Sequence, residues 1–199
     1  MVIRVVPGSL QAYGTRAGSQ FNDIGQSLQA LVTTVVEVDY FGPNADTLKT
    51  HCGALAVEFS AELIHRLAAI VDVISQTTSG ISRALGEMQP VVIPFEAVPP
   101  AVNVGGAFRD DGTREVRANV GALGELPGQV TAAFGAIEAI LDEHLSALSA
   151  TNWDGNAKTQ AVAAVSSYTA GAKALCAQYN GEIVGYLNDQ IQSLASADA

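Results

Sequence analysis

The side chains best suited to chemistry are three histidines and one acidic cluster. His51, His65 and His144 do not stand at a metal-ligand spacing, since His51 and His65 are about four helical turns apart. In Asp142-Glu143-His144, adjacent residues of a helix point to different faces, so they do not converge on one reacting atom. We therefore expect solvated or boundary histidines, no metal site and no acid–base pair.

Other catalytic arrangements are also missing from the sequence pattern. Cys52 and Cys176 have no partner at metal-ligand or redox-motif spacing, which predicts that both are small buried apolar side chains. Gly105-Gly106 and Gly121-Ala122-Leu123-Gly124 do not follow a predicted strand, as a phosphate-binding loop would. The sequence thus predicts a protein that is not an enzyme and needs no cofactor.

Composition narrows the classes further. The chain has 199 residues, of which 48% are hydrophobic and 15% charged, enough to bury a core in one domain or two small ones. Its formal net charge of −10 argues against a nucleic-acid partner. The N-terminus lacks the pattern of a cleaved signal peptide, and no uncharged apolar run approaches the ~18 residues of a membrane-spanning helix.

Four helical segments would have to position these residues. Apolar residues recur every three or four positions from Leu10 to Val38 and again from Leu48 to Leu85, which predicts two helices. Tyr40-Phe41-Gly42-Pro43 interrupts the pattern and predicts a tight turn. One helical hairpin cannot cover its own apolar stripes, so a second pair of helices is expected to pack on it.

The second half repeats this arrangement after a linker rich in proline and glycine at 88–110. The linker is apolar enough, for example at Val91, Ile93 and Phe95, to lie against the helices. A third helix is predicted to start at Asp111 or Thr113, with a kink or break near Leu126. A turn at 152–156 then leads into a fourth helix.

The two turns carry a family resemblance. Trp153-Asp154-Gly155 stands in the second turn and the degenerate Tyr40-Phe41-Gly42 in the first. Each half resembles the WXG family, the ESAT-type helical-hairpin proteins exported by bacterial type VII secretion systems. The predicted division is a hairpin at 1–87 with its turn at 40–43, the linker at 88–110, and a hairpin at 111–199 with its turn at 152–156.

This resemblance implies an all-α fold in which two antiparallel hairpins pack as an elongated four-helix bundle. The chain would be a single-chain pseudo-heterodimer, a monomer that mimics a dimer. Antiparallel docking separates the end of the second helix from the start of the third by about 60 Å, and roughly 20 extended residues reach that far. It also places Cys52 and Cys176 roughly 14 Å apart, so no disulfide is expected.

The resemblance further implies a bipartite export signal. In the family, the turn of one hairpin lies beside a tyrosine of the partner's last helix, with an acidic residue four positions later. Here Tyr179 and Tyr186 have Glu182 and Asp189 only three positions later. The candidate recognition residues are therefore Trp153, Gly155, Tyr40, Gly42, Tyr179, Glu182, Tyr186 and Asp189. The alternative is that the tyrosines are core or boundary residues and that the Trp153 ring only packs between helices.

The implied function is a type VII secretion substrate or an export adaptor or chaperone that acts through protein–protein interaction. Its partner would be the secretion machinery or a co-secreted protein. It would be cytoplasmic before export, then secreted or in the cell envelope, without a cleaved signal peptide. The alternatives are a secreted membrane-active, pore-forming protein and a structural assembly protein. The negative net charge and the lack of a basic amphipathic face disfavour a membrane interaction.

Overall fold

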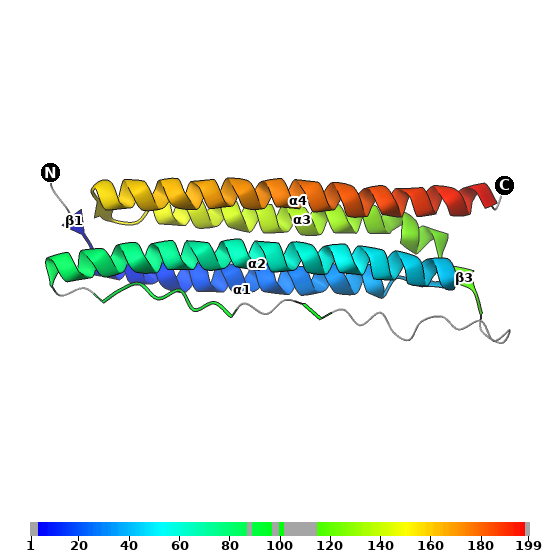
Figure 1. Cartoon of the computed structure of the whole chain (residues 1–199), viewed down its shortest axis with the longest axis horizontal. Coiled ribbons are helices and arrows are strands. Elements are labelled where there is room, and N and C mark those ends of the chain that lie inside the picture. The colour runs from blue at the N-terminus through cyan, green and yellow to red at the C-terminus, as the bar shows by residue number, and fades with distance from the viewer. Residues whose placement is uncertain (1–3, 87–88, 97–99, 102–114, 198–199) are drawn as a thin grey trace. The chain divides into compact units, whose positions relative to one another are not determined.

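The computed structural model describes residues 4–86, 89–96, 100–101 and 115–197, and it confirms the predicted all-α, four-helix class. The helices are α1 (Pro7–Val36), α2 (Pro43–Leu85), α3 (Val120–Ser149) and α4 (Asn156–Ala197). Four two-residue strands accompany them among the described residues: β1 (Arg4–Val5), β2 (Tyr40–Phe41), β3 (Arg117–Ala118) and β4 (Trp153–Asp154) (Figure 1).

The chain separates into two compact units that cut across the hairpins. Unit 1 consists of Met1–Gly25, Glu62–Val98 and Ile137–Ala174; unit 2 consists of Gln26–Ala61, Pro99–Ala136 and Leu175–Ala199. Each unit therefore contains a segment of all four helices. The predicted division into two hairpins follows the order of the elements along the chain. That each hairpin is a domain stays a prediction.

Unit 1 packs α1 antiparallel to α3. The Ser9 hydroxyl accepts a hydrogen bond from the Asn152 N–H at 2.8 Å, and Arg16 pairs with Glu143. The core of unit 1 is made of large side chains that the helical periodicity predicted, among them residues of α1 and α2. The fully buried members include Leu10, Phe21, Ile24, Leu63, Leu67 and Ile70.

Unit 2 packs α2 antiparallel to α4. The ring of Phe59 lies 4.8 Å from that of Phe134 and 5.6 Å from that of Tyr179, and the ring of His51 lies 4.4 Å from that of Tyr186, tilted against it. Cys52 and Cys176 are both buried here, as predicted, and no disulfide joins them. Burial raises the pKa of the Cys52 thiol to about 12.

Short antiparallel strands, which the sequence did not predict, connect the two halves of the chain within each unit. In unit 1, β1 pairs with β4, and in unit 2, β2 pairs with β3. The strand that precedes one hairpin thus pairs with the turn of the other hairpin. The local periodicity could not reveal this, because each strand has only two residues and its partner is far away in the sequence.

The predicted start of the third helix is wrong. Asp111 and Thr113 lie outside the described residues, but 115–119 are not helical and α3 begins at Val120. The Asn119 side chain caps this helix by accepting the Ala122 N–H at 3.0 Å. Of the kink or break predicted near Leu126, the break is absent, since α3 runs through Pro127. Figure 1 shows the first turns of α3 at an angle to those that follow, which is the kink.

Linker residues 89–96 lie against the helices of unit 1, as predicted. Val91 and Ile93 are buried, and Phe95 packs edge-on against the ring of Phe21 at 5.5 Å. Most of the predicted linker, at 97–99 and 102–110, lies outside the described residues.

Candidate functional site

The residues of the two turns correspond at a constant offset in the sequence, so the second half of the chain repeats the first. Arg117 stands 113 positions after Arg4, and Trp153 stands 113 positions after Tyr40, and each of these residues belongs to the equivalent strand pair. The backbone contacts match as well. The Val6 N–H donates to the Asn152 carbonyl at 2.9 Å, and the Asn119 N–H donates to the Asp39 carbonyl at 3.0 Å. The same scaffold therefore presents two different sets of side chains, one in each unit.

In unit 1, the Trp153 turn is closed by the N-terminal segment. Trp153 pairs with Val5 across the strand register and is 0% exposed. Arg4 donates to the Asn152 side chain at 2.8 Å and lies 3.7 Å from the Asp154 carboxylate. Gly155 ends the turn with a φ of +129°, an angle that non-glycine residues rarely adopt.

The burial of Trp153 fits a ring that packs between helices. Its Nε1 atom is buried without a hydrogen-bond partner among the described residues. A partner cannot touch the buried ring directly in this state. A recognition role for Trp153 and Gly155 stays a prediction, and the partner would have to contact the residues that cover the ring.

In unit 2, the equivalent turn exposes an aromatic side chain. Tyr40 is buried, but Phe41 is 47% exposed, where unit 1 has Asp154. Gly42 has a φ of +134°, and a Cβ there would lie 2.8 Å from the Val116 side chain. Val116 is itself 64% exposed. The turn therefore combines a constrained backbone with uncovered apolar surface.

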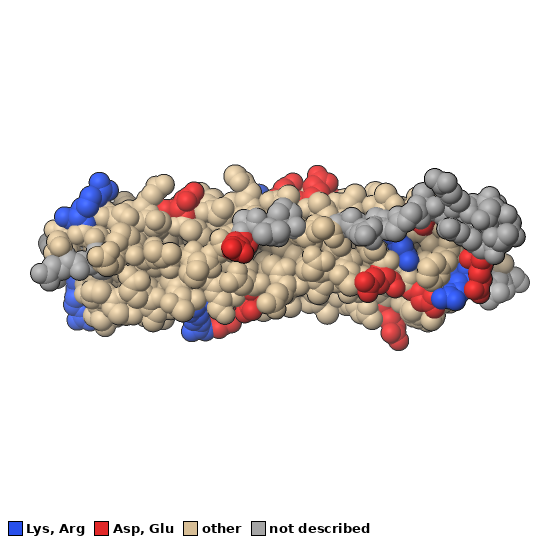
Figure 2. Space-filling model, turned by 90° about the horizontal axis from the view of Figure 1, so that it is seen from below, with Lys and Arg blue, Asp and Glu red and all other residues tan. Residues whose placement is uncertain are grey.

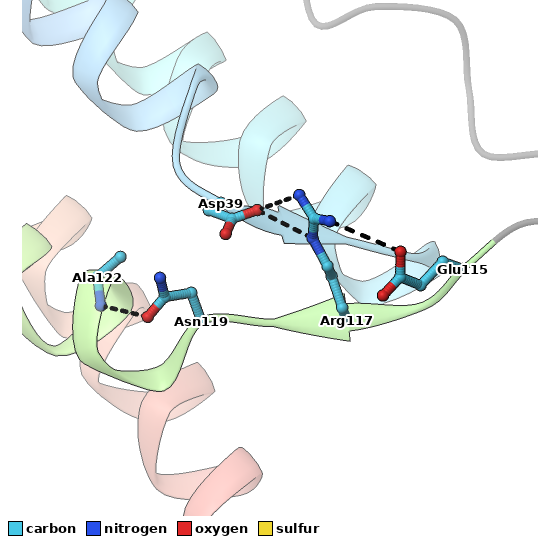
Figure 3. Close-up of polar contacts among 5 residues, drawn as sticks. All are labelled: Asp39, Glu115, Arg117, Asn119 and Ala122. Atoms are coloured by element: carbon cyan, nitrogen blue, oxygen red, sulfur yellow. Dashed lines mark hydrogen bonds and ion pairs between the residues drawn. The ribbon is translucent and has the colours of Figure 1, made fainter.

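A charged network fixes the strand beside this turn. Arg117 donates from Nε and Nη2 to Asp39 Oδ1, at 3.1 and 2.8 Å, and its Nη1 lies 3.6 Å from Glu115 (Figure 3). These groups are about half exposed or more, so solvent screens the pair and its contribution to stability is small. Its effect is to hold the guanidinium over the Phe41 ring, 4.8 Å from the centroid.

A second cation approaches the same ring. Lys49 Nζ lies 5.0 Å from the Phe41 centroid, and the Lys49 side chain is buried. Burial lowers the pKa of Lys49, and the negative charges of Asp46 and Asp39 offset only part of this effect. The ring also borders an open cleft of about 300 Å³. The cleft is lined by Tyr40, Phe41, Gly42, Pro43, Asn44, Val116, Arg117, Ala118 and Leu194.

The predicted tyrosines of α4 belong to this unit. Tyr179 is buried against Phe59, whereas Tyr186 is half-buried beside His51. The pKa of Tyr40 is raised by burial and secondly by the charge of Tyr186. Glu182 and Asp189 are exposed.

The structure thus places six of the eight candidate residues in unit 2 and two in unit 1. Tyr40, Gly42 and the four residues of α4 share unit 2, while Trp153 and Gly155 lie in unit 1. Sequence reasoning missed Phe41, Lys49, Val116 and Arg117. The signal was present as the repeated arginine, since Arg4 and Arg117 stand at the same distance before their helices.

The acidic cluster behaves as expected, but one histidine does not. Asp142 pairs with Lys173 and Glu143 with Arg16, so these neighbours reach different helices. The prediction of a solvated or boundary His144 is wrong: it is fully buried and its Nε2 lies 3.2 Å from the Tyr13 hydroxyl. Burial lowers the pKa of His144 to about 4. His51 and His65 are exposed.

No set of three or more histidine, cysteine, aspartate or glutamate side chains could hold a metal ion within the described ranges. On the face in Figure 2, acidic and basic side chains are spread out and do not form a basic patch. The helices, as far as they are described, include none that is long and apolar enough to cross a membrane.

Comparison with known proteins gives no assignment: no family model, no curated protein and no solved structure matches the chain.

Proposed function

We propose that the chain is a non-enzymatic interaction module of WXG type, a type VII secretion substrate or an export adaptor or chaperone. The observation that supports this is that the Tyr40-Phe41-Gly42 turn and the α4 segment from Tyr179 to Asp189 both belong to unit 2, where Leu194, farther along α4, lines the same cleft as the turn. These are the two parts that the family resemblance requires side by side.

Accessibility supports the same unit as the recognition surface. Phe41, Glu182 and Asp189 all reach solvent, so a partner could contact an aromatic ring and carboxylates in unit 2. Aromatic side chains at the centre of a contact, with charges at its rim, are typical of binding hot spots. In the repeat, Tyr186 and Asp189 correspond to Val73 and Gln76 of α2, which carry no phenol and no carboxylate.

The test is export from a host that contains a type VII system. An epitope-tagged chain is followed outside the cell in the wild-type host and in one that lacks the type VII motor. We expect release to depend on the motor. Release that is unchanged without the motor would refute the export version of the proposal.

The site is tested in the same assay with charge-neutral variants. Glu182→Gln/Asp189→Asn should reduce release by about tenfold, the effect of losing a hydrogen bond to a charged group worth about 1.5 kcal/mol. Asp72→Asn removes an exposed carboxylate from α2 in unit 1 and is the matched control. If release depends on the motor but is the same for both variants and the wild-type chain, the proposed function is supported and the role of Glu182 and Asp189 is rejected.

A further inference from the structure

The described linker segment 89–96, called the strap here, follows α1 through unit 1 in the direction of that helix. The Gln11 amide donates to the carbonyls of Gln89 and Pro90, at 3.1 and 3.5 Å. Farther along α1, Phe21 meets Phe95. The strap is therefore a docked extended segment with a defined register on the helix.

Two glycines make the floor of the groove that receives it. A Cβ at Gly14 would lie 2.6 Å from the Val91 side chain and 2.8 Å from the Val92 carbonyl oxygen. At Gly18 it would lie 2.7 Å from the Pro94 ring and 2.8 Å from the Pro94 carbonyl oxygen. Residues four apart share one face of a helix, so the strap lies directly on the backbone of α1. Any larger residue at either position would push it away.

Helix α2 supplies the other wall. Thr78 is fully buried, and its hydroxyl accepts the Val91 N–H at 3.1 Å while donating to the Ile74 carbonyl at 2.8 Å. Strap side chains alternate as in an extended strand: Val91 is 1% exposed, Val92 is 71% exposed and Ile93 is buried. The groove thus selects branched apolar side chains at alternate positions and one backbone N–H.

The two glycines and the threonine that form the groove are present in the first half of the chain and are not repeated in the second. The positions of α3 and α4 that correspond to Gly14, Gly18 and Thr78 hold Pro127, Thr131 and Ile191. Packing four helices therefore does not require the glycines or the threonine. Gly25, on the same helix, has open space where a Cβ would be, which shows that close approach is specific to Gly14 and Gly18.

We propose that α1 and α2 form a peptide-binding groove in unit 1, centred on Gly14 and Gly18, which the strap occupies as a ligand in cis and can vacate. Its occupant is an extended segment with branched apolar residues at alternate positions, followed by proline. Release breaks the strap's side-chain contacts and a few hydrogen bonds, whereas core contacts such as that of Phe21 with His144 stay in place. The strap is therefore an autoinhibitory contact over this groove.

The proposal is tested with a fluorescently labelled synthetic peptide of residues 89–96, added to the full chain. Val91→Ser/Ile93→Ser/Phe95→Ala weakens the strap but leaves the groove. We expect this variant to bind the peptide at least tenfold more tightly than the wild-type chain, because the cis ligand no longer competes. Adding Gly14→Leu/Gly18→Leu should abolish binding, whereas adding Gly25→Leu should not.

Two results would overturn the proposal. One is a weakened-strap variant with normal helical circular dichroism that does not bind the peptide. The other is binding that persists when the groove is filled. If the variant does not fold, hydrogen exchange on the wild-type chain decides: the Val91 amide should exchange at least tenfold faster than the slowest amides of α1 and α2, and equal rates would show that the strap cannot leave separately.

Discussion

His144 is a fully buried histidine that lies among aromatic rings. Its ring lies 4.7 Å from that of Phe21 and 5.5 Å from that of Tyr13, and its Nδ1 is buried without a hydrogen-bond partner among the described residues. The repeat places Leu31 at the equivalent position of α1. An ionisable side chain thus occupies an apolar core position, and protonation there is disfavoured by burial.

This burial predicts a loss of stability in mild acid. In the unfolded chain the histidine titrates near its ordinary pKa of 6.5, whereas in the folded chain its pKa is about 4. The unfolded state therefore binds more protons between these values, and the free energy of unfolding falls as the pH drops from 6.5 towards 4. The loss from this group is about 2 kcal/mol by pH 5 and about 3 kcal/mol below pH 4.

Urea unfolding at pH 7 and pH 5 measures this effect. Tyr13→Phe/His144→Leu removes the titrating ring together with the hydroxyl that would otherwise lose its partner. We expect the variant to keep about 2 kcal/mol more of its pH 7 stability at pH 5 than the wild-type chain does. An equal loss in both proteins would assign the acid sensitivity to other groups.

At the scale of elements, the short strands decide what each turn presents. In unit 1, β1 covers the turn that contains Trp153, and the indole is completely buried. In unit 2, β3 pairs with the equivalent turn, yet Phe41 remains half exposed. The two turns share a backbone arrangement and differ in surface chemistry.

Removal of β1 should expose the tryptophan. Trp153 is the only tryptophan in the chain, so its fluorescence reports on this turn alone. A chain without residues 1–6 should show a red-shifted emission maximum and stronger acrylamide quenching, because water then reaches the indole. Arg117→Ala breaks the equivalent side-chain pair in unit 2 and is the control that should leave both signals unchanged. Unchanged emission after the deletion would mean that the helices alone bury the ring.

At the scale of the molecule, the chain supplies both partners of each strand pair. The apolar stripes of all four helices are largely buried in the two units, and few large apolar residues in the described ranges remain exposed. A second copy is not needed to cover a hairpin, so we expect a monomer. Light scattering coupled to size exclusion should give a mass near 20.5 kDa at all concentrations. A mass of twice that value, rising with concentration, would instead indicate self-association.

The helices could be predicted because their signals are local. The apolar stripes from Leu10 to Val38 and from Leu48 to Leu85 end at the turn and at Gly86, close to the observed limits of α1 and α2. The predicted start of α3 is wrong because Asp111 and Thr113 are residues of capping type, whereas Asn119 caps the helix. Capping residues are common in loops, so their type alone does not fix a boundary.

The four helices, the two aromatic-x-glycine turns and the repetition of one unit can be predicted from the amino-acid sequence, since these features depend on residues a few positions apart. The burial of Trp153, the contact of His144 with Tyr13 and the presence of Tyr40 and Tyr186 in one unit follow from the folded structure alone. The Tyr13–His144 contact joins residues 131 positions apart. Periodicity says which face of a helix is buried, but which side chains meet across that face depends on the register between helices, and that register is set by packing.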